Sequence, residues 1–405
     1  MAEGTGITGP LSGIKILDCT IWQNGPSATV ILSDLGAEVI KVEDPVTGDP
    51  SRGIRYPGTD DGVSGYFEAV NRNKRSITLD LKSPEGRDIF LRLAAESDVV
   101  VQNFRFGVVE KLKIAYPDVL KVNPTVIYAS VTGFGREGPD AKVGVFDILG
   151  QARSGALKAL SYPGVPITYN NAFGLADQCG GMMLAQAITA ALFARERTGE
   201  GQELEISQLG SMMVLQQMGL SRSLLNGIPL PPTSREQPVN PLFTTYECAA
   251  GEWIALGGLQ PDRYWAAFCG ILDLPEVASD PRFGSMEART ANSRELVGVL
   301  DKAFAKCQRA DLLKQFADAG IPCAPVNSYQ DVANDVQVLA NEYIIDLPHP
   351  VRGSTRVINM PIRFSKTPAR ARSAAPQMGQ DTEAVLLELG LTWDDISALH
   401  EKKIL

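Results

Sequence analysis

Histidine is nearly absent from this chain of 405 residues, which has only His349 and His400, both close to the C-terminus. A serine hydrolase triad, a histidine-rich metal site or a histidine general base would have to use one of these two. His349 stands in the motif LPHP, which predicts a loop, and His400 lies in a charged terminal stretch that predicts a solvated helix. We therefore expect the chemistry of this protein to run without histidine.

The six cysteines lack the spacing of a metal site or of a redox pair, because no two of them form a C-x-x-C motif. Scattered thiols in a long chain are typical of reduced core residues in a reducing compartment. No metal site is therefore expected.

An excess of basic charge is also missing, since the formal net charge is -9. Nucleic acids and anionic membranes favour basic surfaces, so neither is an expected partner. No apolar run is long enough to cross a bilayer. The first residues, MAEGTGITGPLSG, lack the basic and apolar regions of a signal peptide. Together these absences predict a cytoplasmic protein.

What the sequence does contain is an ordinary globular composition, with 44% hydrophobic and 21% charged residues, and enough length for two or more domains. In its first half, short β-rich runs alternate with helical stretches, which is typical of a parallel sheet packed against helices. The expected strands are residues 14–18, 38–42, 76–81, 98–104, 125–132 and 203–207.

Helix signals separate these strands. A helix begins near Pro26 and stops at Gly36, and Ser83 followed by Pro84 predicts the capped start of another. A long run of small and apolar residues, 174–197, predicts a largely buried helix. No G-x-G-x-x-G follows the first strand, so the sheet is Rossmann-like in layout without the fingerprint of a dinucleotide site.

The second half is organised differently. A helical run over residues 208–226 precedes a proline-rich linker candidate, residues 227–241. Residues 242–259 then resemble a hairpin with AAGE as its turn, followed by helical patterns to about residue 319. The expected domains are a large α/β domain over 1–226 completed by about 345–405, a smaller α+β domain over 227–325, and a linker and C-terminal return over 326–405.

Eight segments, in the same order from end to end, resemble the family III CoA-transferases. They are LSGIKILDCT with the following QNGP, LGAEVIKVEDPVTGDPSR, NRNKRSITLDLKSPEGR, DVVVQNFRFGVVEKL, NPTVIYASVTGFGREGP, GLADQCGG, ARERTGEGQELEIS and GIPCAPV. The resemblance covers nearly the whole chain. It implies a large Rossmann-like domain with a parallel sheet, a smaller α+β domain, and protomers interlocked as a ring-like dimer. It also implies an enzyme that moves coenzyme A from an acyl thioester to a free carboxylate.

Asp177, in GLADQCGG, matches the nucleophilic aspartate of that family. Exchanging a thiol between two carboxylic acids without hydrolysis requires a covalent relay, which a carboxylate can serve. The resemblance implies aspartyl anhydride and aspartyl-CoA thioester intermediates, each formed through an oxyanion that N–H donors must stabilise. Gly180 and Gly181 leave little side-chain bulk nearby. The local sequence taken alone favours Asp177 as the N-cap of the long helix, and both roles can coexist.

The resemblance assigns coenzyme A binding to residues of the first domain: Gln23, Asn24, Leu79, Lys82, Asn103, Phe104, Arg105 and Lys111. The cations among them can neutralise phosphate, and Phe104 offers an apolar contact for adenine. Each lysine is otherwise a solvated residue on a helix face. Arg72, Lys74 and Arg75 form a further basic cluster, suited either to phosphate binding or to pairing between domains. Coenzyme A and acyl-CoA are substrates, and no permanently bound cofactor is implied.

Two departures from the family pattern bear on the substrates. Asp44 stands where formyl-CoA transferases have an arginine that approaches the adenine nucleotide, so one CoA contact is in question. The segment PTSREQPVNPLF lacks the glycine run that covers oxalate in that subfamily, so oxalate is not the expected acceptor. Succinyl-CoA with an organic acid is the expected pair. Arg222 and Arg235 are either contacts for a second carboxylate or surface residues.

Two alternatives stay open. The related α-methylacyl-CoA racemase uses a histidine–aspartate pair, whereas the matching stretch here, residues 145–149, carries Phe146, which cannot move a proton. A racemase or epimerase is therefore disfavoured. Some family members consist of two homologous subunits, and because Asp177 is present this chain would be the active one. The expected partners are thus acyl-CoA, a small carboxylic acid, and either a second copy of the chain or a homologous subunit.

Overall fold

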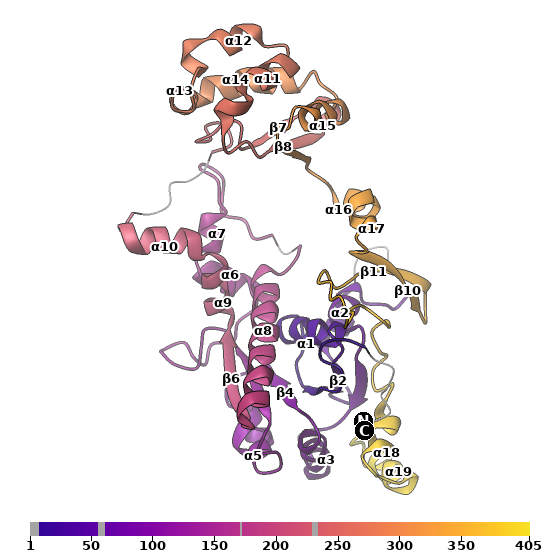
Figure 1. Ribbon diagram of the computed structural model, residues 1–405. Helices are drawn as coiled ribbons and strands as arrows, with labels where there is room; N and C mark the ends of the chain where they lie inside the picture. The colour runs from indigo at the N-terminus through magenta and orange to yellow at the C-terminus, as the bar shows by residue number, and fades with distance from the viewer. Residues whose placement is uncertain (1–7, 56–60, 171, 229–233) are drawn as a thin grey trace. The chain divides into compact units, whose positions relative to one another are not determined.

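The computed structural model describes residues 8–55, 61–170, 172–228 and 234–405 (Figure 1). The chain forms two compact units. The first comprises Met1–Lys158, Thr168–Ile228 and Leu339–Leu405, and the second comprises Ala159–Ile167 and Pro229–Val338. The N-terminal stretch before residue 8 and residues 229–233 of the linker candidate lie outside the described residues.

The first unit is built on a six-stranded parallel sheet with the strand order β3-β2-β1-β4-β5-β6. Its strands are β1 (Lys15–Asp18), β2 (Glu38–Glu43), β3 (Arg75–Thr78), β4 (Val99–Gln102), β5 (Ile127–Thr132) and β6 (Gln202–Ser207). Each coincides with one of the expected β-rich runs. The order is that of a Rossmann fold, in which the direction of winding reverses between β1 and β4. The predicted α/β class with a parallel sheet is confirmed.

Helices cover both faces of this sheet, because alternate strand residues point to opposite sides. On one face, Ile16 packs in a core with α1 (Asn24–Asp34) and α8 (Leu175–Thr198). On the other face, Leu17 packs in a core with α3 (Pro84–Ala95). Each fully buried Leu or Ile side chain contributes about 1.5–3 kcal/mol. The first of these cores holds α1 and α8 side by side, which matters for the site described below.

Side-chain hydrogen bonds decide where several helices begin and end. Ser83 Oγ accepts from the N–H of Gly86 (2.9 Å) at the start of α3, which confirms the predicted cap. The expected helix over residues 208–226 is instead two helices, because Gln216 departs from helical geometry and its side chain donates to the carbonyl of Met212 (2.9 Å). The helical segments not yet named that precede residue 229 are η1 (Pro50–Gly53), α2 (Gly65–Asn71), α4 (Val108–Leu112), α5 (Tyr116–Leu120), α6 (Asp147–Arg153), α7 (Ala156–Ala159), α9 (Gln208–Leu215) and α10 (Gln217–Asn226).

The C-terminal segment returns to the sheet and covers its edge strand β3. Asp381 accepts from the N–H of Ser76 (2.9 Å) and donates its own N–H to the Ser76 carbonyl (2.8 Å), so the unpaired edge is protected. The helices α18 (Thr382–Glu388) and α19 (Trp393–Glu401) follow.

A hairpin that the sequence did not predict precedes this return. It pairs β10 (Ile344–His349) with β11 (Gly353–Ile358). His349 therefore ends a strand, and its prediction as a loop residue is wrong. Pro348 is tolerated there because a two-stranded ribbon leaves one side of each strand unpaired.

The second unit contains the predicted hairpin, which pairs β7 (Thr245–Glu247) with β8 (Trp253–Leu256), and adds a third antiparallel strand, β9 (Cys323–Pro325). Phe268 stacks on Phe316 (5.6 Å between centroids) at the centre of its core. Its helical segments are η2 (Ala249–Gly251), α11 (Pro261–Ile271), α12 (Pro275–Ser279), η3 (Pro281–Phe283), α13 (Met286–Ala291), α14 (Ser293–Phe304), α15 (Arg309–Asp318) and α16 (Tyr329–Asn334), followed by α17 (Val336–Ala340). Across the described ranges, every helix is too short or too polar to traverse a lipid bilayer.

Candidate active site

The loop that follows β1 is tied to the end of the neighbouring strand β4. The side chain of Asn103 accepts from the backbone N–H of Ile21 (3.0 Å) and donates to its carbonyl (2.8 Å). Trp22, next in the loop, has a left-handed backbone with φ of 66°, which a non-glycine residue adopts only where its surroundings enforce it. The loop lies at the carboxyl ends of β1 and β4, where open parallel sheets bind ligands.

A network of buried carboxylates and lysines lies beneath this loop. The Asp18 carboxylate accepts a hydrogen bond from Lys74 Nζ (3.0 Å), and Lys41 Nζ donates to the carbonyl of Thr20 (2.7 Å). Desolvation opposes ionisation of Asp18, but the charges of Lys74 and Lys41 outweigh it and lower the pKa of Asp18 to about 2. Desolvation, with a smaller contribution from the positive charge of Lys41, lowers the pKa of Lys74 to about 8, although the charge of Asp18 opposes this decrease.

Asp49 connects these charges to the loop backbone. Its carboxylate pairs with Lys41 (2.8 Å) and accepts from the N–H of Trp22 (3.1 Å). The side chains of both Asp49 and Lys41 are fully buried. The unusual backbone of the loop is therefore held by a desolvated ion pair rather than by surface contacts.

The basic cluster of Arg72, Lys74 and Arg75 is engaged within the first unit. Besides the Lys74–Asp18 pair, Arg72 pairs with Asp34 (2.5 Å) and Arg75 pairs with Glu388 (2.7 Å). These cations are already neutralised by nearby carboxylates. They stabilise the fold, and the cluster is not a phosphate site.

Glycines bring α8 against α1 beside the loop. A Cβ added at Gly180 would lie 2.3 Å from Asn24 Nδ2, and one added at Gly181 would lie 2.6 Å from the Cβ of Ser27. Any larger residue at either position would push the helices apart. The two glycines thus serve close helix packing rather than clearing space around a reacting group.

Asp177 is the third residue of α8, not its cap. The N-cap residue is Gly174, which has no side chain to accept a hydrogen bond. The Asp147 carboxylate, at the start of α6, caps the helix instead: its Oδ1 accepts from the N–H groups of Ala176 (2.6 Å) and Asp177 (3.0 Å). The interpretation of Asp177 as the N-cap is therefore wrong, and its carboxylate is not used to cap the helix.

The Asp177 carboxylate is half-buried, and its Oδ1 accepts a hydrogen bond from Gln208 Nε2. Desolvation, followed by the negative charge of Asp147, raises the pKa of Asp177 to about 7. The hydrogen bond from Gln208 and the nearby amide of Asn24 oppose this increase. A carboxyl whose pKa lies this far above its ordinary value is typical of a functional site.

Asp147 is itself held in place by two donors. Its Oδ2 accepts from Gln151 Nε2 (2.6 Å) and from the hydroxyl of Tyr169 (2.8 Å). Asp147, Gln208 and Tyr169 are not among the site residues predicted from sequence. Gln208 had one available signal, since it directly follows a parallel strand, where site residues gather. Asp147 directly follows Phe146, and in that stretch only the phenylalanine was interpreted. No sequence pattern marks Tyr169.

The residues expected to bind coenzyme A differ in what they expose. Lys82, Arg105 and Lys111 are exposed cations. Leu79 is only 1% exposed and belongs to the core beneath the sheet, so it can reach a ligand only through its backbone. Phe104 packs partly against the same core. The cations are thus accessible from solvent, while the apolar residues pack largely in the core.

Gln23 and Asn24, at the start of α1, also differ from each other. The Gln23 side chain is engaged at both ends, because Tyr66 donates to its Oε1 (3.0 Å) and its Nε2 donates to the carbonyl of Phe173 (3.2 Å). Neither polar atom of the Asn24 side chain has a hydrogen-bond partner among the described residues.

Two positions at which this chain differs from related enzymes, Asp44 and Phe146, have identifiable neighbours. Asp44 lies 3.5 Å from Lys82 Nζ, a pair exposed enough to contribute at most about 1 kcal/mol. Phe146 is 57% exposed and meets Trp22 edge to face (6.2 Å between centroids). No proton carrier occupies its position.

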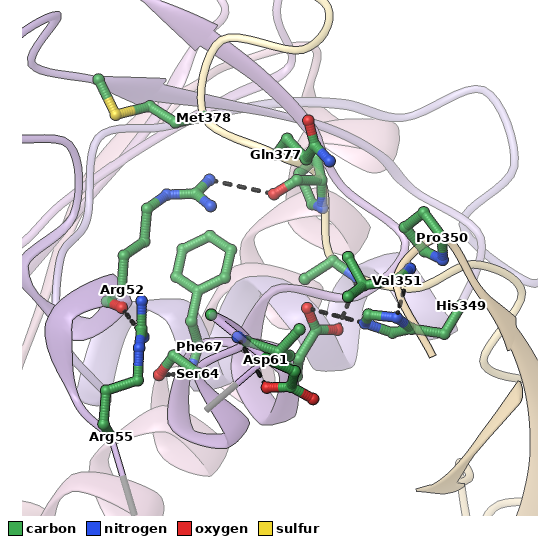
Figure 2. Close-up of a pocket in the computed structure, with 15 residues that line it drawn as sticks. Arg52, Arg55, Asp61, Ser64, Phe67, His349, Pro350, Val351, Gln377 and Met378 are labelled. Carbon is green, nitrogen blue, oxygen red and sulfur yellow. Dashed lines mark hydrogen bonds and ion pairs between the residues drawn. The ribbon is translucent and has the colours of Figure 1, made fainter. Parts of the chain in front are cut away.

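A cavity of about 300 Å³ opens in the first unit beside α2 (Figure 2). Arg52 and Arg55 line one side and His349 lines the other, with the Phe67 ring between them. The Arg52 guanidinium lies 3.7 Å from the centre of that ring and pairs with Glu43 (2.7 Å). None of the site residues predicted from sequence lines this cavity.

In the second unit, Arg235 is not available to bind a carboxylate substrate. Its guanidinium forms a two-pronged ion pair with Asp301 and donates to the carbonyl of Thr245 (3.1 Å). Arg235 therefore stabilises this unit. Arg222, on α10 of the first unit, is exposed.

Comparison with known proteins agrees with this architecture. Residues 11–382 match the model of a family described as CoA-transferase family III. The chain is 35% identical over 382 residues to an acetyl-CoA:oxalate CoA-transferase of Acetobacter aceti, covering 94% of this chain and 96% of the relative. It is 33% identical over 395 residues to a succinyl-CoA:glutarate CoA-transferase of Mus musculus, covering 95% and 87%. A solved structure of a CAIB/BAIF family protein from Brucella suis is similar over 94% of this chain and 100% of that one, with a TM-score of 0.87 and 32% identity. The chain therefore belongs to CoA-transferase family III and is an enzyme of that class.

Proposed function

We propose that this enzyme transfers coenzyme A from an acyl-CoA to a small carboxylic acid through covalent intermediates on Asp177. The observation that carries the proposal is the setting of that carboxylate. It is half-buried in the first turn of α8, its pKa is raised to about 7, and Asp147 caps the turn that bears it. A carboxylate removed from water and not used as a cap is suited to act as a nucleophile.

The proposed relay has four steps and needs no proton transfer. An Asp177 oxygen attacks the thioester carbonyl, and the C–S bond breaks to release CoA thiolate and leave a mixed anhydride. The thiolate attacks the Asp177 carbonyl, expels the donor carboxylate and forms an aspartyl-CoA thioester. An acceptor carboxylate attacks that carbonyl, releases the thiolate and forms a second anhydride. The thiolate then attacks the acceptor's acyl carbon, which yields the new acyl-CoA and restores Asp177.

The absence of a general base from this scheme agrees with the positions of both histidines. His349 Nδ1 accepts from the N–H groups of Val351 and Arg352 (3.1 Å each), and His400 lies 3.2 Å from Glu383. Both are engaged with the C-terminal segment. Racemisation of an α-carbon requires a base near the thioester, so the racemase alternative has no support from these contacts.

For coenzyme A itself, we propose that Lys82, Arg105 and Lys111 neutralise the phosphates, since all three are exposed cations. Phe104 would contact the adenine with the part of its ring that the core leaves open, and Leu79 would contribute its backbone. The remaining predicted contacts, Gln23, Asn24 and Asn103, lie at the loop after β1, and Asn103 acts by holding that loop.

The acid substrates are proposed from chemistry and from the relatives. Relatives named for oxalate and for glutarate as acceptors are about equally similar to this chain. The missing glycine run argues against oxalate, so we propose succinyl-CoA as the donor and a larger organic acid as the acceptor. A screen of acyl-CoA donors against carboxylate acceptors, with mass detection of new thioesters, tests this pairing. Preferential transfer to oxalate would contradict it.

Covalent trapping tests the relay directly. Wild-type enzyme incubated with an acyl-CoA and hydroxylamine should acquire a hydroxamate on the peptide that contains Asp177. Peptide mass mapping locates the modification, and enzyme incubated with free CoA in place of acyl-CoA is the control. If Asp177 stays unmodified while the enzyme turns over, the covalent mechanism is wrong.

The raised pKa of Asp177 predicts a pH dependence. The nucleophile must be ionised, so kcat/KM of the wild type should fall as the pH drops through about 7. In Asp147→Asn, an acceptor oxygen remains for the two N–H groups of α8 but the negative charge is gone. Since that charge helps to raise the pKa of Asp177, the acid limb should move to lower pH. A pH profile of kcat/KM measures both. An acid limb that moves to higher pH would show that Asp147 does not act through its charge.

We also propose that the enzyme works as a homodimer. None of the residues of α10 is buried, and Met218, Leu224 and Leu225 are at least 80% exposed, so this helix presents large apolar side chains to solvent. The family resemblance makes a second copy of the chain the expected occupant of this surface. A homologous partner subunit is the alternative.

Replacement of both leucines tests this assembly. Leu224→Glu/Leu225→Glu should shift the protein from dimer to monomer in light scattering coupled to size exclusion, because carboxylates cannot be buried unpaired in an interface. Arg222→Glu, on the same exposed helix, is the matched control and should stay dimeric. A wild type that is monomeric and active refutes the homodimer. A wild type active only with a homologous chain supports the heteromer.

A further inference from the structure

Asn24 has a buried side chain with no hydrogen-bond partner. It is the first residue of α1 and is 5% exposed, yet both its Oδ1 and its Nδ2 lack partners among the described residues. Buried amides in native proteins are nearly always paired, because an unpaired one has lost its hydration without compensation. Such a group is expected where a ligand or a reacting atom supplies the missing partner.

The carboxamide of Asn24 lies against the turn that carries the nucleophile. A Cβ added at Gly180 would lie 2.3 Å from Asn24 Nδ2 and 2.9 Å from its Oδ1, so the amide covers Gly180 closely. Gly180 follows Asp177 by three residues, and residues at that spacing share one face of a helix. Asn24 also opposes the increase in the pKa of Asp177, which places its amide near that carboxylate although no hydrogen bond joins the two.

A second carboxamide, that of Gln208, approaches Asp177 from another helix and differs from Asn24 in its hydrogen bonding. Gln208 Nε2, at the start of α9, already donates to Asp177 Oδ1 in the resting enzyme. The amide N–H groups of Asn24 are not used in this way. Asp177 is therefore flanked by one amide that already donates to its carboxylate, that of Gln208, and by a second amide without an acceptor, that of Asn24.

We propose that Asn24 donates the hydrogen bond that stabilises the oxyanion formed when the Asp177 carbonyl is attacked. This rests on the covalent relay proposed above. In the second step, the sulfur of CoA bonds to Cγ of Asp177, and the π electrons of the Asp177 C=O bond move to its oxygen. Asn24 Nδ2–H then donates a hydrogen bond to this negatively charged oxygen. Collapse of the adduct expels the donor carboxylate. The same donor acts when the acceptor carboxylate attacks the thioester. Asn24 packs against Gly180, which lies on the same helix as Asp177. Its position is therefore set relative to Asp177 and does not depend on a bound ligand.

This role differs from the coenzyme A contact that the family resemblance assigns to Asn24, and kinetics separate the two. A donor used only in the transition state changes kcat, whereas a ground-state contact changes KM. In Asn24→Ala, kcat should fall about 100-fold, while KM for acyl-CoA stays within about threefold of the wild type. The rate at which CoA becomes covalently attached to the enzyme, followed by quenched-flow mass spectrometry, should fall in parallel.

Two further variants complete the experiment. Asn24→Leu keeps the branching of the side chain without the amide, and it should show the same loss of kcat even if the alanine variant folds poorly. Ser27→Ala is the matched control. This serine is also buried on α1, its hydroxyl has no partner among the described residues, and it faces Gly181. Its kcat should stay within about threefold of the wild type.

Each other outcome overturns the proposal. A raised KM with unchanged kcat makes Asn24 a coenzyme A contact, and unchanged values of both make it a packing residue. An equal loss of kcat in Ser27→Ala assigns the effect to the contact between α1 and α8. The covalent relay fails separately, if wild-type enzyme forms no adduct on Asp177.

Discussion

Asp177→Asn should lower kcat by at least roughly a thousandfold, because a carboxamide cannot attack a thioester to form an anhydride. Asparagine keeps the shape of the side chain and an oxygen that can accept from Gln208 Nε2, as Oδ1 does in the wild type. The fold should therefore be unchanged. Mass detection of the new thioester measures kcat, and Asp177→Ala should show the same loss. Asp118→Asn, a surface carboxylate paired with Lys121, should retain wild-type activity. Activity near wild type in either Asp177 variant would refute its role as nucleophile.

The same substitution should stabilise the protein at neutral and alkaline pH. Between pH 3.8 and about 7, an unfolded chain ionises this carboxyl while the folded protein keeps it protonated. Stability is therefore lost as the pH rises through that window, and the loss is constant above it. About 3 pH units separate the two pKa values, which corresponds to at most about 4 kcal/mol. Asp177→Asn should exceed the wild type in unfolding free energy at pH 8 and match it at pH 4. Equal stabilities at both values would mean that the carboxylate is not desolvated.

The second large effect concerns the buried charges beneath the loop after β1. In Lys74→Met, Asp18 loses one of its two cations, and the side-chain oxygen of Asn71 loses a donor (2.9 Å). Removing one partner from a buried ion pair costs about 3–5 kcal/mol, because it leaves an uncompensated charge out of contact with water. We therefore expect a loss of this size in the unfolding free energy, measured by denaturant titration.

An exposed lysine provides the matched comparison. Lys121, whose side chain is 73% exposed, pairs with Asp118 at 3.2 Å on the surface. Lys121→Met should change the unfolding free energy by no more than about 0.5 kcal/mol. If Lys74→Met is equally mild, the buried network does not hold the loop. If it is costly, kcat should fall as well, since Asp49 and Lys41 of the same network bind the backbone on either side of Ile21.

The strands and the main helices could be predicted from sequence because their signals are local. Each of the six β-rich runs forms a strand, and Ser83 caps α3 as its position before Pro84 predicts. Two local features were nevertheless missed. The hairpin of β10 and β11 was missed because one of its strands contains proline. The helical run 208–226 was divided at Gln216, whose side chain turns back to bind the main chain.

Of the site, the sequence by itself indicated the proposed nucleophile, because Asp177 sits in a segment that a family resemblance can mark. Only the tertiary structure decided what surrounds it. Asp147 and Gln208 lie 30 and 31 residues from Asp177 in the chain, and they reach it only because α6, α8 and α9 come together. The pKa of Asp177 depends on desolvation and on that neighbouring charge, neither of which exists in an extended chain. The same holds for the basic cluster, because its cations pair with carboxylates distant in sequence, whereas sequence alone left open whether they bind phosphate or pair between domains.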